Sequence, residues 1–452
     1  MTDYRAVINN PHSDPQERLR GLGELEKKYP AKPAGTGEVN NHIHTIYSFS
    51  PYTPSMAALM ARDAGLLAAG SVDHDSAGAA EEMIAACAIL GIGGCTGFEV
   101  RVSFKKSPEG KPGPFAEKKI NNPDSTGLAY MTVQGIPAPA LPRVRDFLAP
   151  IRKERLARTR EMTESANAIL HEAGLPEIDF QHDVIDKSMY NHNGEVTERH
   201  LLAAAAEKLI IQYGKGPGIN EKLGHLGVSP PVKIAQSLSD PENPHYLYDL
   251  LGILKSGFLS RIFIQPGDRE CINAKEVCAF ADSIGAIPAY AYLGDIAESP
   301  TGDKKAEKFE DDYIEELFDE LSRLGYRALT YMPPRNTLTQ LRRVQRLCAE
   351  RGFMEISGVD INSSRQSFNC PEILQDDFRH LLDTTWALIA HERLASVDSR
   401  FALFSPANPL YTLPLQQRLA AYALAGKDLD TKNPEASAPA ILKKLQEGRY
   451  QV

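Results

Sequence analysis

Short apolar runs typical of β-strands alternate with helix-like segments in two parts of this chain, and this alternation constrains its fold more than any other feature. The strand-like runs cover residues 39–46, 67–75 and 95–104 in the first part, and 286–293, 327–332 and 353–361 in the second. The helical patterns between them cover 54–64, 79–90, 304–324 and 337–351. Strand and helix in alternation predict a parallel sheet covered by helices, so the fold class is α/β.

The alternation is interrupted in the middle of the chain. A loop rich in Lys, Pro and Gly is expected at 105–125, a strand at 128–136, and an arginine-rich amphipathic helix at 142–173. The expected units are an N-terminal arm (1–37, with a helix at 15–28), the first part of the barrel (38–136), a helical insertion (137–260), the second part of the barrel (261–393) and a polar helical tail (394–452). We expect the insertion to cover the active-site rim, and the arginines between 144 and 160 to form a solvated helix face.

Histidines and acidic residues stand where three of these strand-like runs end. The stretches are His42-x-His44, Asp73-His74-Asp75 and Gly97-x-Glu99. Side chains two positions apart on a strand point to the same face, so both imidazoles of the first stretch can bind one metal ion. Because strand ends converge at the rim where barrel enzymes place their chemistry, the chain is predicted to be a metal-dependent enzyme.

Composition removes several other functional classes. The net charge is −9 without a long basic run, so nucleic acid is not an expected partner. No run of about eighteen apolar residues and no apolar leader occurs, which predicts a cytoplasmic protein that binds no membrane. The 6 cysteines form no Cys-x-x-Cys pair and indicate neither a disulfide framework nor a thiolate zinc site. The oligomeric state stays open, a homo-oligomer included.

The order of these motifs resembles that of the polymerase and histidinol phosphatase (PHP) family. The resemblance also rests on the apolar strand 285–292 and on Ser357-Gly358-Val359-Asp360; it covers roughly 39–104 and 260–365, with a weaker echo at 197–201. It implies a distorted TIM-like (β/α)7 barrel, here with an inserted, mainly helical subdomain. It also implies a rim that binds up to three metals, mostly zinc, manganese or iron, and the hydrolysis of phosphate esters.

The ligands that the resemblance implies are only partly present. His42, His44, Glu99 and Asp360 match the set that would hold the first metal. Four further ligand positions carry Phe49, Tyr130, Tyr292 and Asn362. Phenylalanine cannot coordinate, and tyrosine and asparagine are poor ligands for these metals. We therefore predict one divalent ion (Zn, Mn or Fe) and not three, unless His182, His192 or Asp124 supplies a ligand from outside the motifs.

Without a third metal, His74 would have no metal partner and becomes a candidate general acid or base. Asp73 or Asp75 could fix the tautomer of its ring. The candidate substrate contacts are Tyr130, Tyr292, Asn362, Arg199, His200, Arg335 and Arg365. Arginine forks match phosphate and carboxylate groups, so a small anionic substrate is favoured. The two tyrosines equally fit packing roles, and the arginines fit ordinary surface charges.

The leading hypothesis is a metal-dependent hydrolase of a small phosphorylated metabolite, in which one divalent metal activates water and His74 transfers protons. The first alternative is an amidohydrolase, or a lyase or isomerase acting on a sugar acid. It is motivated by the loss of the multi-metal arrangement that usually serves phosphoryl transfer. The second alternative is a non-catalytic PHP-like protein that binds a metal and a ligand.

Overall fold

The computed structural model describes residues 3–30, 35–107, 110–296 and 307–450. One seven-stranded sheet in the order β1-β2-β3-β4-β5-β6-β7 forms its centre. The strands are β1 (Val39–Ile43), β2 (Ala68–His74), β3 (Gly93–Ser103), β4 (Leu128–Gln134), β5 (Ile287–Ala291), β6 (Ala328–Tyr331) and β7 (Met354–Ser357). Contacts between β1 and β7 almost close the sheet into a barrel. The predicted α/β fold, a distorted seven-stranded barrel, is confirmed.

The direction of β4 differs from the prediction of a parallel sheet. β4 runs antiparallel to both β3 and β5, whereas the other neighbouring pairs are parallel. The loop from 104 to 127 connects β3 to β4 without a helix in its described residues, so the chain turns back on itself instead of crossing over. A parallel pair needs a crossover connection, and the helical pattern is missing at this point of the sequence.

Side chains and loop backbone hold β1 against the end of β7. Asn41 donates from Nδ2 to the carbonyl oxygen of Ser357 (2.9 Å). Beyond the strands, the backbone N–H of His44 donates to the carbonyl of Ile361 (2.9 Å), and the N–H of Ile361 donates to the carbonyl of His42 (3.1 Å). The segment that carries Asp360 is therefore fixed beside the segment that carries the two histidines.

Helices cover the outside of this barrel. Those of the arm and the barrel are α1 (Tyr4–Ile8), α2 (Pro15–Lys28), α3 (Pro54–Asp63), α4 (Ala80–Leu90), α10 (Ala274–Ile284), α11 (Ile314–Leu324) and α12 (Leu338–Arg351). Their starts follow local capping rules: Thr53 caps α3 ahead of a proline at the first helical position, and Thr337 and Gln340 form a capping box on α12. The helices expected at 15–28 and 337–351 are confirmed.

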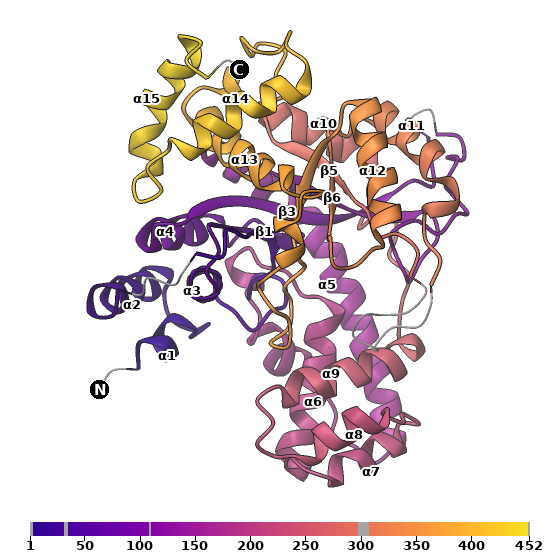
Figure 1. Ribbon diagram of the computed structural model, residues 1–452. Helices are drawn as coiled ribbons and strands as arrows, with labels where there is room; N and C mark the ends of the chain where they lie inside the picture. Colours follow the sequence, from indigo (N-terminus) through magenta and orange to yellow (C-terminus); the bar gives the residue numbers. More distant parts are fainter. Residues whose placement is uncertain (1–2, 31–34, 108–109, 297–306, 451–452) are drawn as a thin grey trace.

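The insertion forms a helical lobe with a hydrophobic core of its own. Its helices are α5 (Leu141–Glu172), α6 (Glu198–Tyr213), α7 (Gly218–His225), α8 (Val232–Ser239) and α9 (Tyr246–Gly257). The long helix α5 starts at the barrel and leads into the lobe, where α6 to α9 gather at the lower end of the view (Figure 1). No helix among the described residues is both long and apolar enough to cross a membrane.

Three arginines of α5 contradict the predicted solvated face, whereas Arg160 is exposed as predicted and Arg145 is half-buried. Arg152, Arg155 and Arg158 are buried, with 3 to 8% of their surface exposed. They share a face with buried apolar residues such as Ile151 and Met162. Arg155 and Arg158 form ion pairs with Asp75, Glu198 and Glu270, which compensate their charge.

The C-terminal helices are α13 (His380–Val397), α14 (Leu415–Lys427) and α15 (Pro434–Gln446). α13 packs against β7 and β3, and α14 packs along α13. Together they lie at the end of the molecule opposite the helical lobe (Figure 1). Their buried apolar side chains belong to the same hydrophobic core as the barrel.

Candidate metal centre

His42 and His44 meet Asp360 where β1 and the segment after β7 run side by side. The Nε2 atom of His44 lies 3.3 Å from Oδ1 of Asp360. Its Nδ1 atom lies 3.3 Å from the hydroxyl of Ser48, which turns Nε2 toward the carboxylates. The His42 and His44 rings are 5.1 Å apart, so the i, i+2 pair does share one face.

Glu99 joins this group to His74 from the neighbouring strands. Paired in register on β2 and β3, His74 and Glu99 place Nδ1 and Oε2 3.1 Å apart. The same Oε2 atom lies 3.7 Å from Nε2 of His44 and 3.8 Å from Nε2 of His42. Three imidazoles therefore surround one carboxylate oxygen where β1 and β2 end beside the middle of β3.

These side chains fit a divalent metal ion. Among the described residues, His42, His44 and Asp360 form one group with ligand atoms within 4.8 Å of one another, and His44, His74 and Glu99 form a second. His44 belongs to both, and its buried Nε2 atom has no hydrogen-bond partner. A buried imidazole nitrogen without a partner is costly unless it has another ligand. Imidazole with carboxylate is a donor set that suits zinc, manganese or iron.

The imidazoles of His42 and His74 differ in their electrostatic surroundings. Burial lowers the pKa of His42, but the nearby carboxylates, led by Glu99, outweigh this effect and raise it. Burial also lowers the pKa of His74, and His44, Arg155 and Arg101 lower it further through charge repulsion, so the result lies well below the usual value. The His74 ring is therefore held in its neutral form at neutral pH, which leaves a nitrogen lone pair available to a metal and makes the ring a weaker base than an ordinary histidine.

Asp73 supports the centre from behind. Its Oδ1 accepts hydrogen bonds from the backbone N–H of Thr45 and the hydroxyl of Ser48 (both 2.7 Å). Ser48 in turn lies against Nδ1 of His44. Asp73, predicted to orient the ring of His74, thus holds the turn that orients His44.

Arg199 and Asn362 lie beside Asp360 on the side of the helical lobe. The Nδ2 atom of Asn362 donates to Asp360 (2.8 Å), and Nη2 of Arg199 donates to the carbonyl of Asn362 (3.1 Å). The guanidinium stacks over Phe49 at 5.2 Å. No carboxylate of the described residues pairs with Arg199 within 4.0 Å, its Nε is buried without a partner, and burial lowers its pKa. The negative charge of Asp360 works against this shift, but a guanidinium that forms no direct ion pair is suited to binding an anion from solution.

His200 and Tyr130 lie beside the centre. Among the described residues, no hydrogen bond joins either side chain to the carboxylates of the centre. His200 closes the capping box of α6, since its Nδ1 accepts the backbone N–H of Thr197 (3.0 Å). Burial, helped by nearby arginines, lowers the pKa of His200 to about 3. The ring of Tyr130 lies 5.8 Å from that of His74, and burial raises the pKa of its hydroxyl.

The structure gives other partners to the remaining candidates. Tyr292 donates its hydroxyl to Asp311 (2.5 Å), and Nε of Arg335 donates to the carbonyl of Leu293 (3.0 Å). Arg365 forms a two-bond ion pair with Asp249 on α9 (2.5 and 2.6 Å). His182 and His192 are exposed on the lobe, and neither they nor Asp124 join a candidate metal group of the described residues.

Sequence reasoning missed a buried ionic network next to the centre. Its members are Asp75, Arg101, Arg155, Arg158, Glu198 and Glu270. One available signal was the spacing of the arginines on α5, which follows the apolar face of that helix and not its solvent face.

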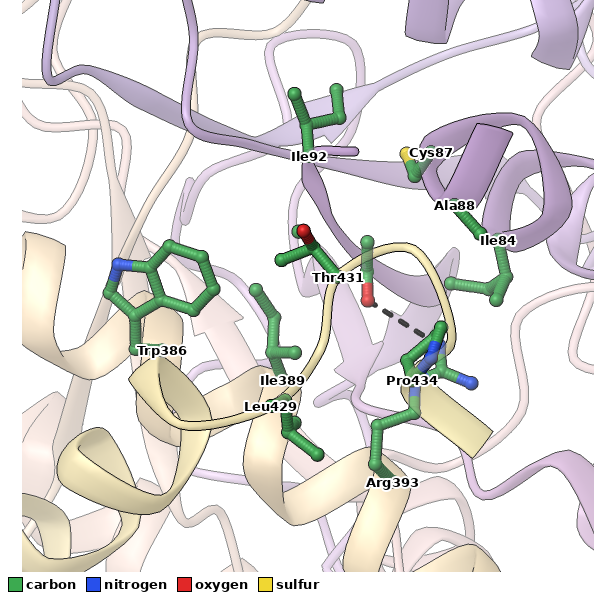
Figure 2. A pocket seen from close by; sticks show the side chains of 12 residues that line it. Ile84, Cys87, Ala88, Ile92, Trp386, Ile389, Arg393, Leu429, Thr431 and Pro434 are labelled. Carbon is green, nitrogen blue, oxygen red and sulfur yellow. Dashed lines mark hydrogen bonds between the residues drawn. The ribbon is translucent and has the colours of Figure 1, made fainter. Parts of the chain in front are cut away.

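A small cavity lies far from this centre. Ile84 and Cys87 of α4, Trp386 and Ile389 of α13, and Leu429 line it (Figure 2). Its volume of about 10 Å³ is room for one water molecule at most. It borders Gly93 and Gly94 at the start of β3, whereas Glu99 lies in the middle of this strand, and none of its lining residues belongs to the candidate site.

No protein-family model matches the sequence, and no match is found among curated proteins. Two solved structures resemble the fold. One is a candidate metal-dependent phosphoesterase from Bifidobacterium adolescentis, with 17% identity over 78% of this chain and 97% of that chain, and a TM-score of 0.47. The other is an amidohydrolase from Chromobacterium violaceum with bound sulfate and no metal, with 18% identity over 76% and 95% and a TM-score of 0.46. At these values the likeness assigns neither a family nor an activity to this chain.

Proposed function

We propose that this protein is a hydrolase that depends on a divalent metal and acts on a small phosphorylated metabolite. The observation that carries the proposal is the convergence of His42, His44 and Asp360 with His74 and Glu99 around the unpartnered Nε2 of His44. The order of these residues along the chain, which resembles that of the PHP family, supports the same conclusion.

Arg199 supports an anionic substrate. Its guanidinium is half-buried and its Nε has no hydrogen-bond partner. The negative charge of nearby Asp360 acts on it, but no carboxylate of the described residues forms an ion pair with it within 4.0 Å. Nearby, the side chain of Asp360 is 38% exposed and that of His74 is 23% exposed, so the centre is open to solvent on this side. A substrate phosphate can thus reach both the metal ligands and Arg199.

A bound divalent ion would lower the pKa of a water molecule and polarise the phosphate. The protein then positions the phosphate with Arg199 and accepts the proton of the attacking water on neutral His74. Water forms the new bond to phosphorus, and the ester bond to the alcohol oxygen breaks. The proton held on His74 passes to that oxygen, so alcohol and phosphate are released.

The first test is elemental analysis of protein purified without added metal or chelator, together with phosphate release from a panel of phosphomonoesters. We expect about one zinc, manganese or iron ion per chain, and turnover that chelation abolishes and metal restores. The variant His44→Ala should lose both metal and turnover, because His44 belongs to both ligand groups.

His74→Ala separates the roles of the two groups. If His74 transfers protons, this variant keeps its metal content while kcat falls by roughly 10²-fold or more. Two ions per chain in the wild type, with one lost in His74→Ala, would instead make His74 a ligand of a second ion. Wild-type protein that binds metal but releases no phosphate would contradict the proposal.

A further inference from the structure

Glu198, the first residue of helix α6, is surrounded by three arginines. Its Oε1 accepts from Nη2 of Arg158 (2.6 Å) and, more weakly, from Nη2 of Arg101 (3.3 Å). Its Oε2 accepts from Nη2 of Arg155 (2.9 Å). Burial favours the neutral form of Glu198, but the three guanidinium groups outweigh this effect and hold its pKa well below the usual range. Glu198 is therefore a buried carboxylate that stays charged.

These arginines come from different parts of the fold. Arg101 extends from β3 of the barrel, two residues beyond Glu99 and on the same face of the strand, whereas Arg155 and Arg158 extend from α5. Glu270, just ahead of α10, accepts from both Arg101 (2.6 Å) and Arg158 (2.6 Å). The start of α6 is thus tied to the barrel and to α5 at once.

Arg155 links this point directly to the candidate metal centre. Its Nη1 donates to Oδ2 of Asp75 (2.6 Å), while its Nη2 donates to Glu198. Asp75 follows His74 and has a left-handed backbone (φ 48°), and its N–H donates to the carbonyl of Glu99 (2.7 Å). One guanidinium therefore spans from the turn after His74 to the residue before Arg199.

We propose that Glu198 is a positioning residue for Arg199: clamped by Arg101, Arg155 and Arg158, it sets the start of α6 so that Arg199 faces the substrate phosphate beside Asp360. This inference rests on the proposed function of the site. It assigns the helical lobe a direct share in substrate binding, since Arg199 belongs to the lobe and the metal ligands to the barrel.

Burial of this network makes it a strong constraint on geometry. Glu198 and Arg199 occupy the first turn of one helix, where Thr197 and His200 also fix the backbone. Loss of one carboxylate among three desolvated arginines leaves positive charge unpaired, so the side chains must rearrange. A displacement of about 1 Å at a substrate contact is enough to weaken binding substantially.

The test uses metal-loaded full-length protein with two readouts: affinity for inorganic phosphate by calorimetry, and KM and kcat for p-nitrophenyl phosphate. The variants are Glu198→Gln, Glu198→Asp, Arg199→Gln and the double variant. We expect Glu198→Gln to weaken phosphate binding and raise KM roughly tenfold or more with a smaller change in kcat. Glu198→Asp keeps the charge and should recover part of the affinity. The double variant should bind no more weakly than Arg199→Gln alone, because the two residues act as one unit.

Glu82→Gln is the matched control for loss of a buried carboxylate. Glu82 pairs with Arg18 (2.6 Å) between α4 and α2, and both side chains are at most 2% exposed. Glu82→Gln and Glu198→Gln should both lower the melting temperature, but Glu82→Gln should leave phosphate affinity and KM unchanged.

Phosphate affinity that is reduced in Arg199→Gln but equal to wild type in Glu198→Gln would overturn the positioning role while leaving the proposed function intact. Equal losses of affinity in Glu198→Gln and Glu82→Gln would overturn it too, because general destabilisation would then explain the effect. A wild type that binds metal but neither binds phosphate nor hydrolyses the ester would overturn the proposed function, and the inference with it.

Discussion

Gly358 lets the last strand of the barrel approach the first at the candidate centre. A Cβ atom at this position would lie 2.6 Å from Cβ and 2.7 Å from the backbone nitrogen of His42. Such a contact is far shorter than atoms tolerate, and a backbone nitrogen cannot rotate away. The glycine therefore serves the close approach that places Asp360 beside His42 and His44.

We predict that Gly358→Ala lowers the free energy of unfolding by about 1 to 3 kcal/mol, because the added methyl group forces the strands apart. Metal content should fall in the same variant, since His42 moves away from Asp360. Chemical denaturation and elemental analysis measure the two effects.

Gly23→Ala is the control for the loss of glycine itself. Gly23 lies in α2, and a Cβ there meets nothing within 4 Å. This substitution should leave metal content unchanged and stabilise the protein slightly. A Gly358→Ala protein with wild-type stability and full metal content would contradict the role assigned to the close contact.

Helix α13 connects the barrel to the C-terminal segment through one buried imidazole. Nε2 of His391 lies 3.0 Å from the carbonyl of Gly135, and Nδ1 accepts the backbone N–H of Leu403 (2.8 Å). This arrangement requires the neutral ring, with its proton on Nε2. Burial lowers the pKa of His391 to about 4, although the bond to Gly135 works against the shift.

Protonation of His391 should therefore destabilise the fold in acid. The unfolded chain takes up this proton near pH 6.5, whereas the folded chain takes it up only near pH 4. The contribution to stability is complete above pH 6.5 and is lost as the pH falls through this window, by about 3 kcal/mol in total. The His391→Gln variant lacks this titrating group, so its free energy of unfolding should not show this loss. The difference in stability between wild type and variant should therefore shrink as the pH falls from 7 to 4.

Urea unfolding of both proteins at several pH values measures that difference. Subtracting one profile from the other cancels groups that titrate in both, such as Glu392, whose pKa burial raises to about 7. Two parallel profiles would show that His391 does not titrate in this range.

The elements themselves were more predictable than the way they pair. Apolar runs and capping residues at each strand or helix are local, so the limits of α2 and α12 and the presence of β4 follow from the sequence. The direction of β4 depends on how the chain returns from β3, and its one sequence signal is the lack of a helical pattern between these two strands. The burial of Arg155 and Arg158 on α5 was not predicted, because their acidic partners come from distant segments of the chain.

The candidate site divides along the same line. His42 and His44 lie at the end of β1, and Glu99 lies within β3 at the level where β2 ends. Such strands converge at one rim of a barrel, so the meeting of these residues was predictable. The partners of Tyr292 and Arg365 lie on loops and on the inserted lobe, whose positions the motif spacing does not define. Glu198 was overlooked because a glutamate at a helix start is common and usually solvated.

At the scale of the whole molecule, the barrel is held between two helical parts that differ in how they attach. The lobe of α6 to α9 has its own hydrophobic core and is joined to the rim by ion pairs such as Arg101–Glu198 and Arg365–Asp249. The C-terminal helices α14 and α15 instead extend the hydrophobic core of the barrel. Changes at the lobe should therefore alter binding, and changes at the C-terminal end should alter stability.

A chain that ends after Val397 tests this difference. Without α14 and α15 the apolar face of α13 loses its cover, and Gly426, which lets α14 approach the backbone of Trp386, is absent. We expect the truncated protein to aggregate or to lose its cooperative melting transition, as seen by size-exclusion chromatography and circular dichroism. A truncated chain that stays monomeric and melts at the wild-type temperature would show that the barrel core is complete without these helices.

The milder Tyr422→Phe removes the hydroxyl that donates to the carbonyl of Phe401 (2.6 Å) and should lower the free energy of unfolding by about 1 to 3 kcal/mol. Because Tyr422 lies on α14, at the far end of the molecule from the lobe, that variant should keep full metal content and phosphate affinity (Figure 1).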